Sequence, residues 1–366
     1  MDTEILKYQI ALTLIPGIGD IVGKKLVAYC GGVEAVFKEN RNALLKIPSI
    51  GNATVNSILS QKVLHRAEEE IKFIEKNRIQ PLFYTDKKYP ARLLNCEDSP
   101  LLLYYKGNTD LNASRVIGFV GTRKATSEGR TNCEQFIEGL KTKEVLVISG
   151  LAYGIDSYAH KAALQNGLPT IGVLGHGLDR IYPAQNKNLA SSMLDNGGLL
   201  TEFKSRVVPD RENFPKRNRI VAGMCDAIVV VESAKKGGAL ITAGLANSYN
   251  RDVFAIPGRI NDEYSMGCNM LIKSNRAALA ESAKDIAYIM GWDDIKVNVK
   301  PQRDLFLQLT DQQKIIYEII IDAKEISIDK LVIESNLPSS KVSSALLILE
   351  FEGLIQSLPG KLYKAF

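Results

Sequence analysis

The sequence predicts an α/β protein organised around a doubly wound parallel sheet, with a helical domain before the sheet and a second small domain after it. Two apolar, β-branched runs, Val116 to Val120 and Val145 to Ile148, each end at a small-residue turn that a helical pattern follows. This order is typical of strands in a parallel sheet. Further runs alternate with helical stretches, so we expect roughly six strands; these runs are Thr170 to Leu174, Gly198 to Thr201, Ala227 to Val231 and Val253 to Ile256.

Length and composition indicate a globular, multi-domain chain. The 366 residues suffice for two or three domains, and a 45% hydrophobic content can fill a sizeable core. We expect an N-terminal domain at 1–65, the sheet domain at 66–292, a polar linker at 293–304 and a C-terminal domain at 305–366. No signal sequence is evident and no apolar run approaches the length of a membrane span, so we expect a cytoplasmic protein without a membrane partner.

Charge and cysteine usage narrow the classes of function. The net charge is only +5, so a nucleic-acid surface would need local clustering of Lys and Arg. The cysteines are far apart, odd in number and never in C-x-x-C spacing, which argues against a disulfide framework and a zinc site. They are Cys30, Cys96, Cys133, Cys225 and Cys268.

Two similar units near the N-terminus, Leu12 to Gly32 and Leu44 to Leu59, each contain a helix end, a Pro-x-Ile-Gly turn and a second helix. They resemble helix-hairpin-helix (SAM-like) motifs, in which glycines bring a helix N-terminus against a phosphate without reading base sequence. The alternative is a turn that joins two packed helices and binds nothing. Because only Lys24 and Lys25 supply charge after the first turn, the sequence favours neither interpretation over the other.

The connecting region, 66–114, contributes a helix and two strands. The segment His65 to Asn77 predicts a solvated helix whose charges surround Ile71 and Ile74, and its acidic run needs no functional role. Two apolar, aromatic runs, Ile79 to Asp86 and Pro100 to Gly107, are expected to extend the main sheet.

Each turn after a predicted strand carries glycine or polar residues. The carboxyl ends of parallel strands share one edge of a sheet, where helix N-termini direct N–H groups toward anions. We therefore expect a single pocket or groove built from many loops. The turn residues expected to shape it are Ser149, Gly150, Gly154, Asp156, Gly175, Gly177, Gly237 and Gly238.

Several cofactor and enzyme sites lack support. The GHGLDR segment has no third glycine and no acidic residue at the expected distance, no P-loop motif is present, and Ser149 is not in a G-x-S-x-G elbow. Asp156 and His160 at helical spacing could hold a metal, but two ligands make a weak site, and a structural hydrogen bond at a helix start is favoured. We expect no metal and no cofactor.

Positive charge gathers from Lys204 to Arg219, where the local sum of +4 is most of the chain's +5. Long arginine side chains beside Phe214 would clamp phosphates next to a ring on which a base can stack, as single-strand binding requires. Arg123 and Lys124 project from another loop of the same edge. The alternative is a solvated helix start with internal ion pairs. The basic residues of the run are Lys204, Arg206, Arg211, Lys216, Arg217 and Arg219.

The C-terminal segment has the order of a winged helix: three helical patterns, starting at Asp311, Ser327 and Ser339, and then a short hairpin. The expected DNA-reading helix offers only one lysine, Lys341. Residues 311–366 hold six Lys and eight Asp plus Glu, a net charge of −2. We expect a protein-interaction or structural role here, although two lysines of the wing, Lys361 and Lys364, would suit DNA.

Together these motifs resemble the DNA-processing protein A (DprA/Smf) family. The resemblance implies an extended Rossmann-like sheet domain between a helix-hairpin-helix domain and a winged helix. The order and spacing of the motifs are specific to this family. Thr122 and Thr201, however, stand where serine is common in the family, and Gly238 and Ala239 replace a Ser-containing turn. The matching segments are Gly121 to Arg123, Ser149 to His160, Gly175 to Pro183 with Asn186, Thr201 to Phe203, Phe214 to Met224, Val230 to Ser233, Gly237 to Ala246 and Val253 to Gly258.

The resemblance implies a non-catalytic protein that binds incoming single-stranded DNA during natural transformation, protects it and helps load the recombinase RecA. Members of the family dimerise through the later part of the sheet domain, which here falls between about Gly237 and Ala280. In the family, the arginine of the G-[ST]-R turn and the residues around F-P-x-R-N-R line the DNA pocket. Carried over with their neighbours, these are Gly121, Thr122, Arg123, Lys124, Phe214, Lys216, Arg217, Asn218 and Arg219, with Lys187 as a weaker candidate.

Two other functions stay open. Phosphate-suited turns, with Glu202 and Glu232 at strand ends, would also fit a Rossmann-like hydrolase that acts on a nucleoside monophosphate. A duplex-binding regulator built on the winged helix is the third hypothesis.

Overall fold

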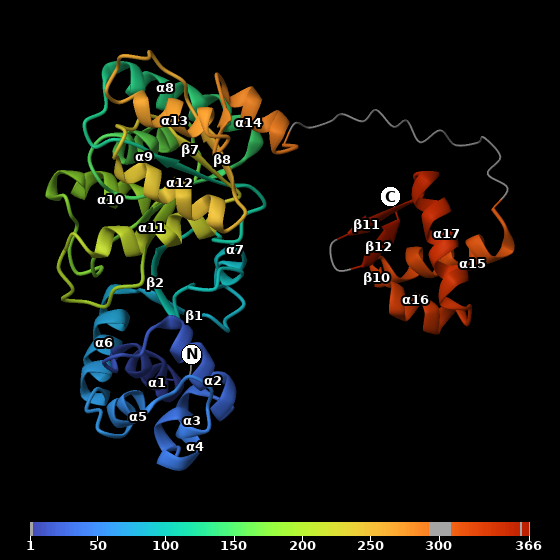
Figure 1. Cartoon of the computed structure of the whole chain (residues 1–366), viewed down its shortest axis with the longest axis horizontal. Coiled ribbons are helices and arrows are strands. Elements are labelled where there is room, and N and C mark those ends of the chain that lie inside the picture. Colours follow the sequence, from blue (N-terminus) through green and yellow to red (C-terminus); the bar gives the residue numbers. More distant parts are fainter. Residues whose placement is uncertain (1–2, 293–308, 359–360, 366) are drawn as a thin grey trace. The chain divides into compact units, whose positions relative to one another are not determined.

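The computed structural model describes residues 3–292, 309–358 and 361–365 (Figure 1). The chain forms two compact units, residues 1–293 and 294–366, and each is described by itself. The predicted linker, 293–304, lies outside the described residues.

The first unit is built on a nine-stranded sheet with the order β1-β2-β6-β5-β4-β3-β7-β8-β9. Neighbours from β6 to β9 are parallel, whereas β1 and β2 extend the β6 edge in antiparallel fashion. The six predicted parallel strands and both predicted extensions are present; β9 was not predicted, because two residues are too few to show a period. The strands are β1 (Gln80–Phe83), β2 (Leu102–Gly107), β3 (Val116–Val120), β4 (Leu146–Ser149), β5 (Thr170–Val173), β6 (Gly197–Thr201), β7 (Ala227–Val230), β8 (Asp252–Ala255) and β9 (Ala278–Leu279).

Both faces of this sheet are covered by helices, as a doubly wound fold requires. In β3, Val116 and Val120 belong to one apolar cluster, and Ile117 and Phe119 belong to another. Successive side chains of a strand point to opposite faces, so an entirely apolar strand must be buried on both. On the first face lie α7 (Ala91–Leu94), α11 (Asn213–Met224), α12 (Gly238–Ser248) and α13 (Met266–Lys273); on the second lie α8 (Ser127–Gly139), α9 (Ile155–Gln165) and α14 (Ala283–Ile289). Helix α10 (Lys187–Met193) and two 3-10 turns, Lys141–Lys143 and Ala184–Asn186, complete this part.

The strand order reverses at β3. Strands β4 to β6 follow on one side of it, and β7 to β9 follow on the other. In open α/β sheets a crevice forms at the carboxyl ends of the two strands where the order reverses. The loops after β3 and β7 meet there, since the N–H of Thr122 donates to the carbonyl of Glu232 at 2.8 Å.

The N-terminal helices share a core with the edge of the sheet. Their apolar cluster includes Ile71 and Ile74 of α6, and also Leu102 and Tyr104 of β2, so it continues past residue 65. The helices are α1 (Thr3–Leu14), α2 (Asp20–Cys30), α3 (Val33–Lys38), α4 (Arg41–Leu45), α5 (Asn52–Leu59) and α6 (Leu64–Asn77).

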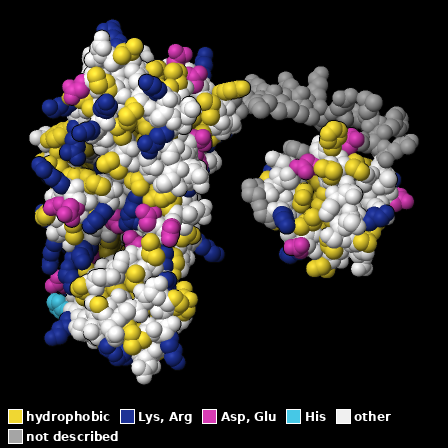
Figure 2. All heavy atoms as spheres, viewed as in Figure 1, with side chains coloured by type: hydrophobic (Ala, Val, Ile, Leu, Met, Phe, Trp, Pro, Cys, Tyr) yellow, Lys and Arg dark blue, Asp and Glu magenta, His cyan; other side chains and the backbone are white. Residues whose placement is uncertain are grey.

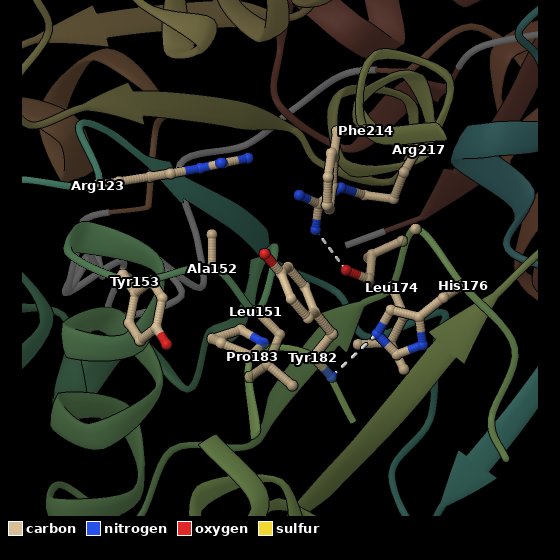
Figure 3. Close-up of a pocket in the computed structure, with 12 residues that line it drawn as sticks. Arg123, Leu151, Ala152, Tyr153, Leu174, His176, Tyr182, Pro183, Phe214 and Arg217 are labelled. Carbon is tan, nitrogen blue, oxygen red and sulfur yellow. Dashed lines mark hydrogen bonds between the residues drawn. The ribbon is translucent and has the colours of Figure 1, made fainter. Parts of the chain in front are cut away.

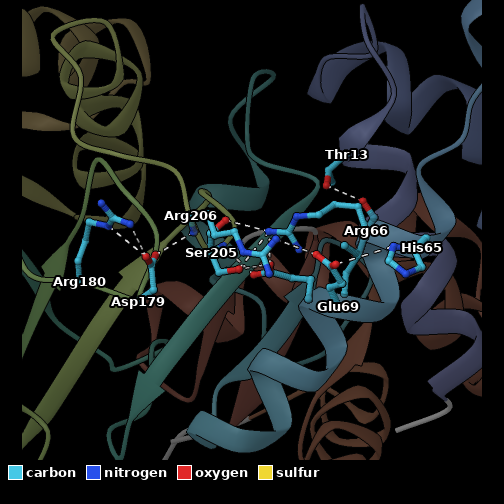
Figure 4. Close-up of polar contacts among 10 residues, drawn as sticks. Thr13, His65, Arg66, Glu69, Asp179, Arg180, Ser205 and Arg206 are labelled. Atoms are coloured by element: carbon cyan, nitrogen blue, oxygen red, sulfur yellow. Dashed lines mark hydrogen bonds and ion pairs between the residues drawn. The ribbon is translucent and has the colours of Figure 1, made fainter.

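The acidic run of α6 has a structural role, so the expectation of a purely solvated run was wrong. Glu70 is only 1% exposed. Its carboxylate accepts hydrogen bonds from the backbone N–H and the hydroxyl of Ser205 and pairs with Arg66 at 2.7 Å. Next to it, the exposed Arg206 pairs with Glu69 at 2.8 Å (Figure 4). Helix α6 therefore holds the turn that follows β6.

The second unit is a winged helix, as predicted. Helices α15 (Asp311–Ala323), α16 (Ile328–Ser335) and α17 (Ser339–Phe351) enclose an apolar core that includes Ile316, Leu331 and Leu346. A three-stranded sheet completes it, formed by β10 (Ile326–Ser327), β11 (Ile355–Leu358) and β12 (Leu362–Ala365) in the order β10-β12-β11.

Across the described parts of the chain, no helix combines the length and apolar character needed to cross a membrane.

Candidate functional site

A groove opens at the crevice between β3 and β7. It has about 1350 Å³ of empty space, which includes open solvent at its mouth, and its walls come from the loops after β3, β4 and β7 and from the starts of α11 and α12. Of the residues proposed from the sequence, those that line it are Gly121, Thr122, Arg123, Gly150, Asp156, Phe214, Arg217, Asn218, Gly237 and Gly238. Arg211, which belongs to the basic run from Lys204 to Arg219, lines the groove as well.

An aromatic pocket adjoins this groove and shares Arg123, Phe214 and Arg217 with it. The Arg123 guanidinium lies over the Phe214 ring at 5.1 Å from its centroid, and the rings of Tyr182 and Phe214 are 6.3 Å apart. Figure 3 shows these side chains converging from the loop after β3, from the loop after β5 and from α11. Aromatic rings beside a guanidinium form a surface on which any nucleobase can stack.

Two residues of this pocket, Tyr153 and Tyr182, were not proposed from the sequence, although both line it and are exposed. Tyr153 follows a predicted strand by five residues and Tyr182 by eight, and they stand next to a glycine and a proline respectively. An aromatic residue beside a glycine or a proline in a turn of the pocket edge is the only local signal that marks them.

Arg217 forms the floor that the groove and the pocket share. Arg217 is 6% exposed, and its Nη1 donates to the carbonyl of Val173. Burial lowers the pKa of this guanidinium, while the charge of Asp156 opposes that shift. An anion that reaches this cation meets a charge that has already lost most of its water, so the hydrogen bond between them is strong.

The glycine turns leave room for these side chains. A Cβ on Gly150 would lie 2.2 Å from Nη1 of Arg217 and 2.3 Å from a carboxylate oxygen of Asp156. Gly154 has φ of +75°, and a Cβ there would lie 2.2 Å from the carbonyl of Thr122. Only glycine fits at Gly154, whereas a Cβ at Gly150 would displace the ends of the Arg217 and Asp156 side chains.

The other proposed turn residues lie around the groove. Ser149 is buried and donates to the carbonyl of Phe119, and Gly175 lines the aromatic pocket. Gly177 packs against the turn at Lys204 instead.

The remaining proposed cations do not line the groove. Lys124, Lys187 and Lys216 are exposed, on the loop after β3, on α10 and on α11 respectively. The cations of the basic run from Lys204 to Arg219 therefore have different surroundings. Of these, only Arg211 and Arg217 line the groove, whereas Arg206 and Arg219 are ion-paired.

Arg219 is held between two carboxylates. Its Nη2 donates to Asp20 of α2 at 3.0 Å and to Glu202, which follows β6. Burial is the largest effect on Glu202 and raises its pKa to about 7, although the Arg219 charge counteracts it. This cluster joins the N-terminal helices to α11.

The same cluster bears on the two interpretations of the first Pro-x-Ile-Gly turn. The carboxylate of Asp20, at the start of α2, accepts from the N–H of Leu101 and from Arg219. Lys24 donates to Ser99 at 2.5 Å. The charged residues at the start of α2 are thus engaged within the chain, which favours the structural interpretation for this turn.

Replacing Glu202 by glutamine should remove one pH dependence of stability. The folded chain keeps a proton on Glu202 up to about pH 7, whereas an unperturbed Glu loses it near 4.5. Between these two pH values the folded state therefore binds more protons than the unfolded state. The contribution of Glu202 to the free energy of unfolding thus falls as pH rises from about 4.5 to about 7. We expect the wild type to lose roughly 1–3 kcal/mol relative to Glu202→Gln between about pH 5 and about pH 8, measured by urea unfolding.

The comparison with the variant is necessary because His160 acts in the opposite direction. Burial lowers the pKa of His160 to about 4, so its contribution to stability is lost as pH falls. His160 is common to both proteins and cancels in the difference. A difference between the two proteins that stays constant over the window would contradict the prediction.

His160 also has the structural role that the sequence favoured, but with other partners. Its ring nitrogens contact the hydroxyl of Thr170 at 2.7 Å and the carbonyl of Gly150 at 2.6 Å, and it thereby supports the turn beneath Arg217. Within the described ranges, no three potential ligands gather into a metal site.

Comparison with known proteins identifies the family. The sequence profile of DNA recombination-mediator protein A matches residues 80–291, and that of the DprA winged helix domain matches 303–361. The chain belongs to the DNA recombination-mediator protein A family. The matched range contains the whole groove and the aromatic pocket.

Similar proteins of this family occur in several bacteria. Protein Smf of Synechocystis is 30% identical, with 98% of each chain covered. DNA processing protein DprA of Streptococcus pneumoniae is 44% identical over 55% of this chain and 71% of its own length. A crystal structure of the S. pneumoniae protein matches with a TM-score of 0.67 at 35% identity, covering 77% of this chain and 97% of that one.

A second solved structure concerns the single-stranded DNA binding mode of DNA processing protein A from Helicobacter pylori. It matches with a TM-score of 0.54 at 26% identity and covers 59% of this chain and 97% of that chain.

Proposed function

We propose that this chain binds single-stranded DNA without regard to sequence, in the groove between β3 and β7, and that it protects incoming DNA and loads RecA during natural transformation. The observation that carries the proposal is the stack of Arg123 on Phe214 above the buried Arg217. Guanidinium groups hold phosphates, and the rings accept bases of any identity.

The relatives support this proposal. The H. pylori structure concerns the binding of single-stranded DNA, and the S. pneumoniae relative is named as a DNA processing protein. RecA loading and natural transformation rest on the family resemblance.

Pairing of two copies through the later part of the sheet domain is part of the same proposal. Strand β9 is at the edge of the sheet, and apolar side chains nearby are exposed, among them Met266, Met270 and Leu279. An exposed apolar surface beside an open strand edge suits association with a second copy.

No specific observation favours the nucleotide hydrolase. Glu232 is buried and accepts from the N–H and the hydroxyl of Thr126, so it supports the start of α8. Glu202 pairs with Arg219. Both carboxylates that motivated the hydrolase therefore have structural partners.

The salt dependence of binding tests the site. Single-strand affinity should fall steeply with salt, and Arg123→Ala combined with Arg211→Ala, which removes two cations that line the groove, should flatten the slope of log K against log salt by about 1.4, or about 0.7 for each lost phosphate contact. Gel shifts with single- and double-stranded DNA in graded salt measure this.

A matched control removes two lysines from the winged helix, Lys361→Ala with Lys364→Ala. This control should keep the wild-type slope. An unchanged slope in the groove variant, with a flattened slope in the control, would move the DNA site to the second unit and support the duplex-binding hypothesis.

A further inference from the structure

Helix α17 presents an apolar stripe to solvent. Leu347 is 68% exposed, Ile348 44% and Phe351 91%, while the opposite side of the helix is buried in the core of the second unit. These positions, with Ser344, follow one another at helical spacing and so share a face. Apolar side chains are visible on the surface of this unit in Figure 2.

This stripe does not suit DNA. In a winged helix the exposed face of this helix would read base edges and contact phosphates, which requires donors and cations. Here the stripe offers a single cation, Lys341, at its start, and Glu352 follows its end. An exposed phenylalanine is costly to keep in water and indicates a surface that is covered in an assembly.

The ends of the stripe are complementary to each other. The positive Lys341 and the small Ser344 lie toward the N-terminus of α17, and the bulky Phe351 and the negative Glu352 lie at its C-terminus. If a second α17 is laid antiparallel on the first, each Lys341 meets Glu352 of the partner subunit, and each phenylalanine faces a serine. The helix dipoles then also oppose each other favourably.

We propose that α17 is a self-association surface, on which the α17 of a second copy of this chain packs antiparallel about a twofold axis near Leu347. A twofold contact requires a patch that is complementary to itself, and a stripe with opposite charge and opposite bulk at its two ends meets that requirement. The surface is separate from residues 237–280, so one chain carries two pairing surfaces. Copies joined through the sheet domains can therefore be linked to further copies through the winged helices.

Cysteine cross-linking of the full chain tests the proposal. In a Cys30→Ser background, which removes the only partly exposed cysteine among the described residues, Leu347→Cys should form a disulfide-linked dimer on mild oxidation. The control, Asp322→Cys, places an exposed thiol on α15 of the same unit and should cross-link several-fold less. Both positions are exposed, so neither change should disturb folding.

A charge exchange tests the antiparallel arrangement. With Leu347→Cys in place, Lys341→Glu alone and Glu352→Lys alone should each reduce the yield of dimer several-fold, and the double variant should restore it. The proposal is overturned if Leu347→Cys cross-links no faster than Asp322→Cys. That result is expected if α17 instead docks on another protein or on its own chain. The proposal is equally overturned if the double variant fails to restore the yield. Single-strand binding should stay unchanged throughout.

Discussion

Arg217→Ala is expected to lower the affinity for single-stranded DNA about 100-fold, or roughly 2.7 kcal/mol. The groove and the aromatic pocket share this buried guanidinium, and Nη1 is held by the carbonyl of Val173. Among the described residues, no protein group accepts from Nη2. Its removal takes away the dehydrated cation and leaves Asp156 without the positive charge beside it. Fluorescence anisotropy with a labelled oligonucleotide measures the loss.

Two further variants separate the geometry of this residue from its charge. Arg217→Lys keeps the charge, but its single nitrogen cannot reproduce the separate positions of Nη1, on the Val173 carbonyl, and Nη2, so most of the loss should persist. Arg211→Ala removes an exposed cation at the rim of the groove and should cost only a few-fold. If Arg211→Ala proves the more damaging change, the buried floor is not the centre of the site. Circular dichroism checks that each variant is folded.

Glu70→Ala is expected to lower the free energy of unfolding by about 3–5 kcal/mol. The change leaves the N–H of Ser205 buried without its acceptor and Arg66 without its ion pair. Burial of polar groups without partners is among the largest single-residue costs in a protein. Urea unfolding followed by circular dichroism gives the value.

The neighbouring residue provides the control. Glu69 is also acidic and on α6, and it pairs with the exposed Arg206. Because a surface ion pair contributes little, Glu69→Ala should change stability by at most about 1 kcal/mol. Equal effects at the two positions would show that Glu70 does not hold the turn after β6.

The sequence predicted most of the fold because the signals are local. A buried parallel strand is apolar throughout, a glycine marks a turn that only glycine fits, and a helix repeats its apolar residues at its own period. These signals indicated β3 to β8, the two added strands and the winged helix. They missed β9, because a pair of residues carries no period.

Part of the site could also be predicted from local sequence. Gly121 to Arg123 and Phe214 to Arg219 stood out by composition, and the parallel topology predicted that their loops share an edge. Arg123, Phe214 and Arg217 do meet there. The tyrosines at 153 and 182 carried no charge signal, and only the folded loops brought them to the pocket.

The sequence by itself determined that positive charge is concentrated between Lys204 and Arg219, and the tertiary structure decided which of these cations line the groove. Arg219 and Ser205 find their partners, Asp20 and Glu70, at separations of 199 and 135 positions. No local pattern encodes such contacts, because they depend on how the N-terminal helices pack on the sheet. The physical reason is that the residue type sets the charge of a side chain, whereas the fold sets its ion-pair partner and its exposure to water.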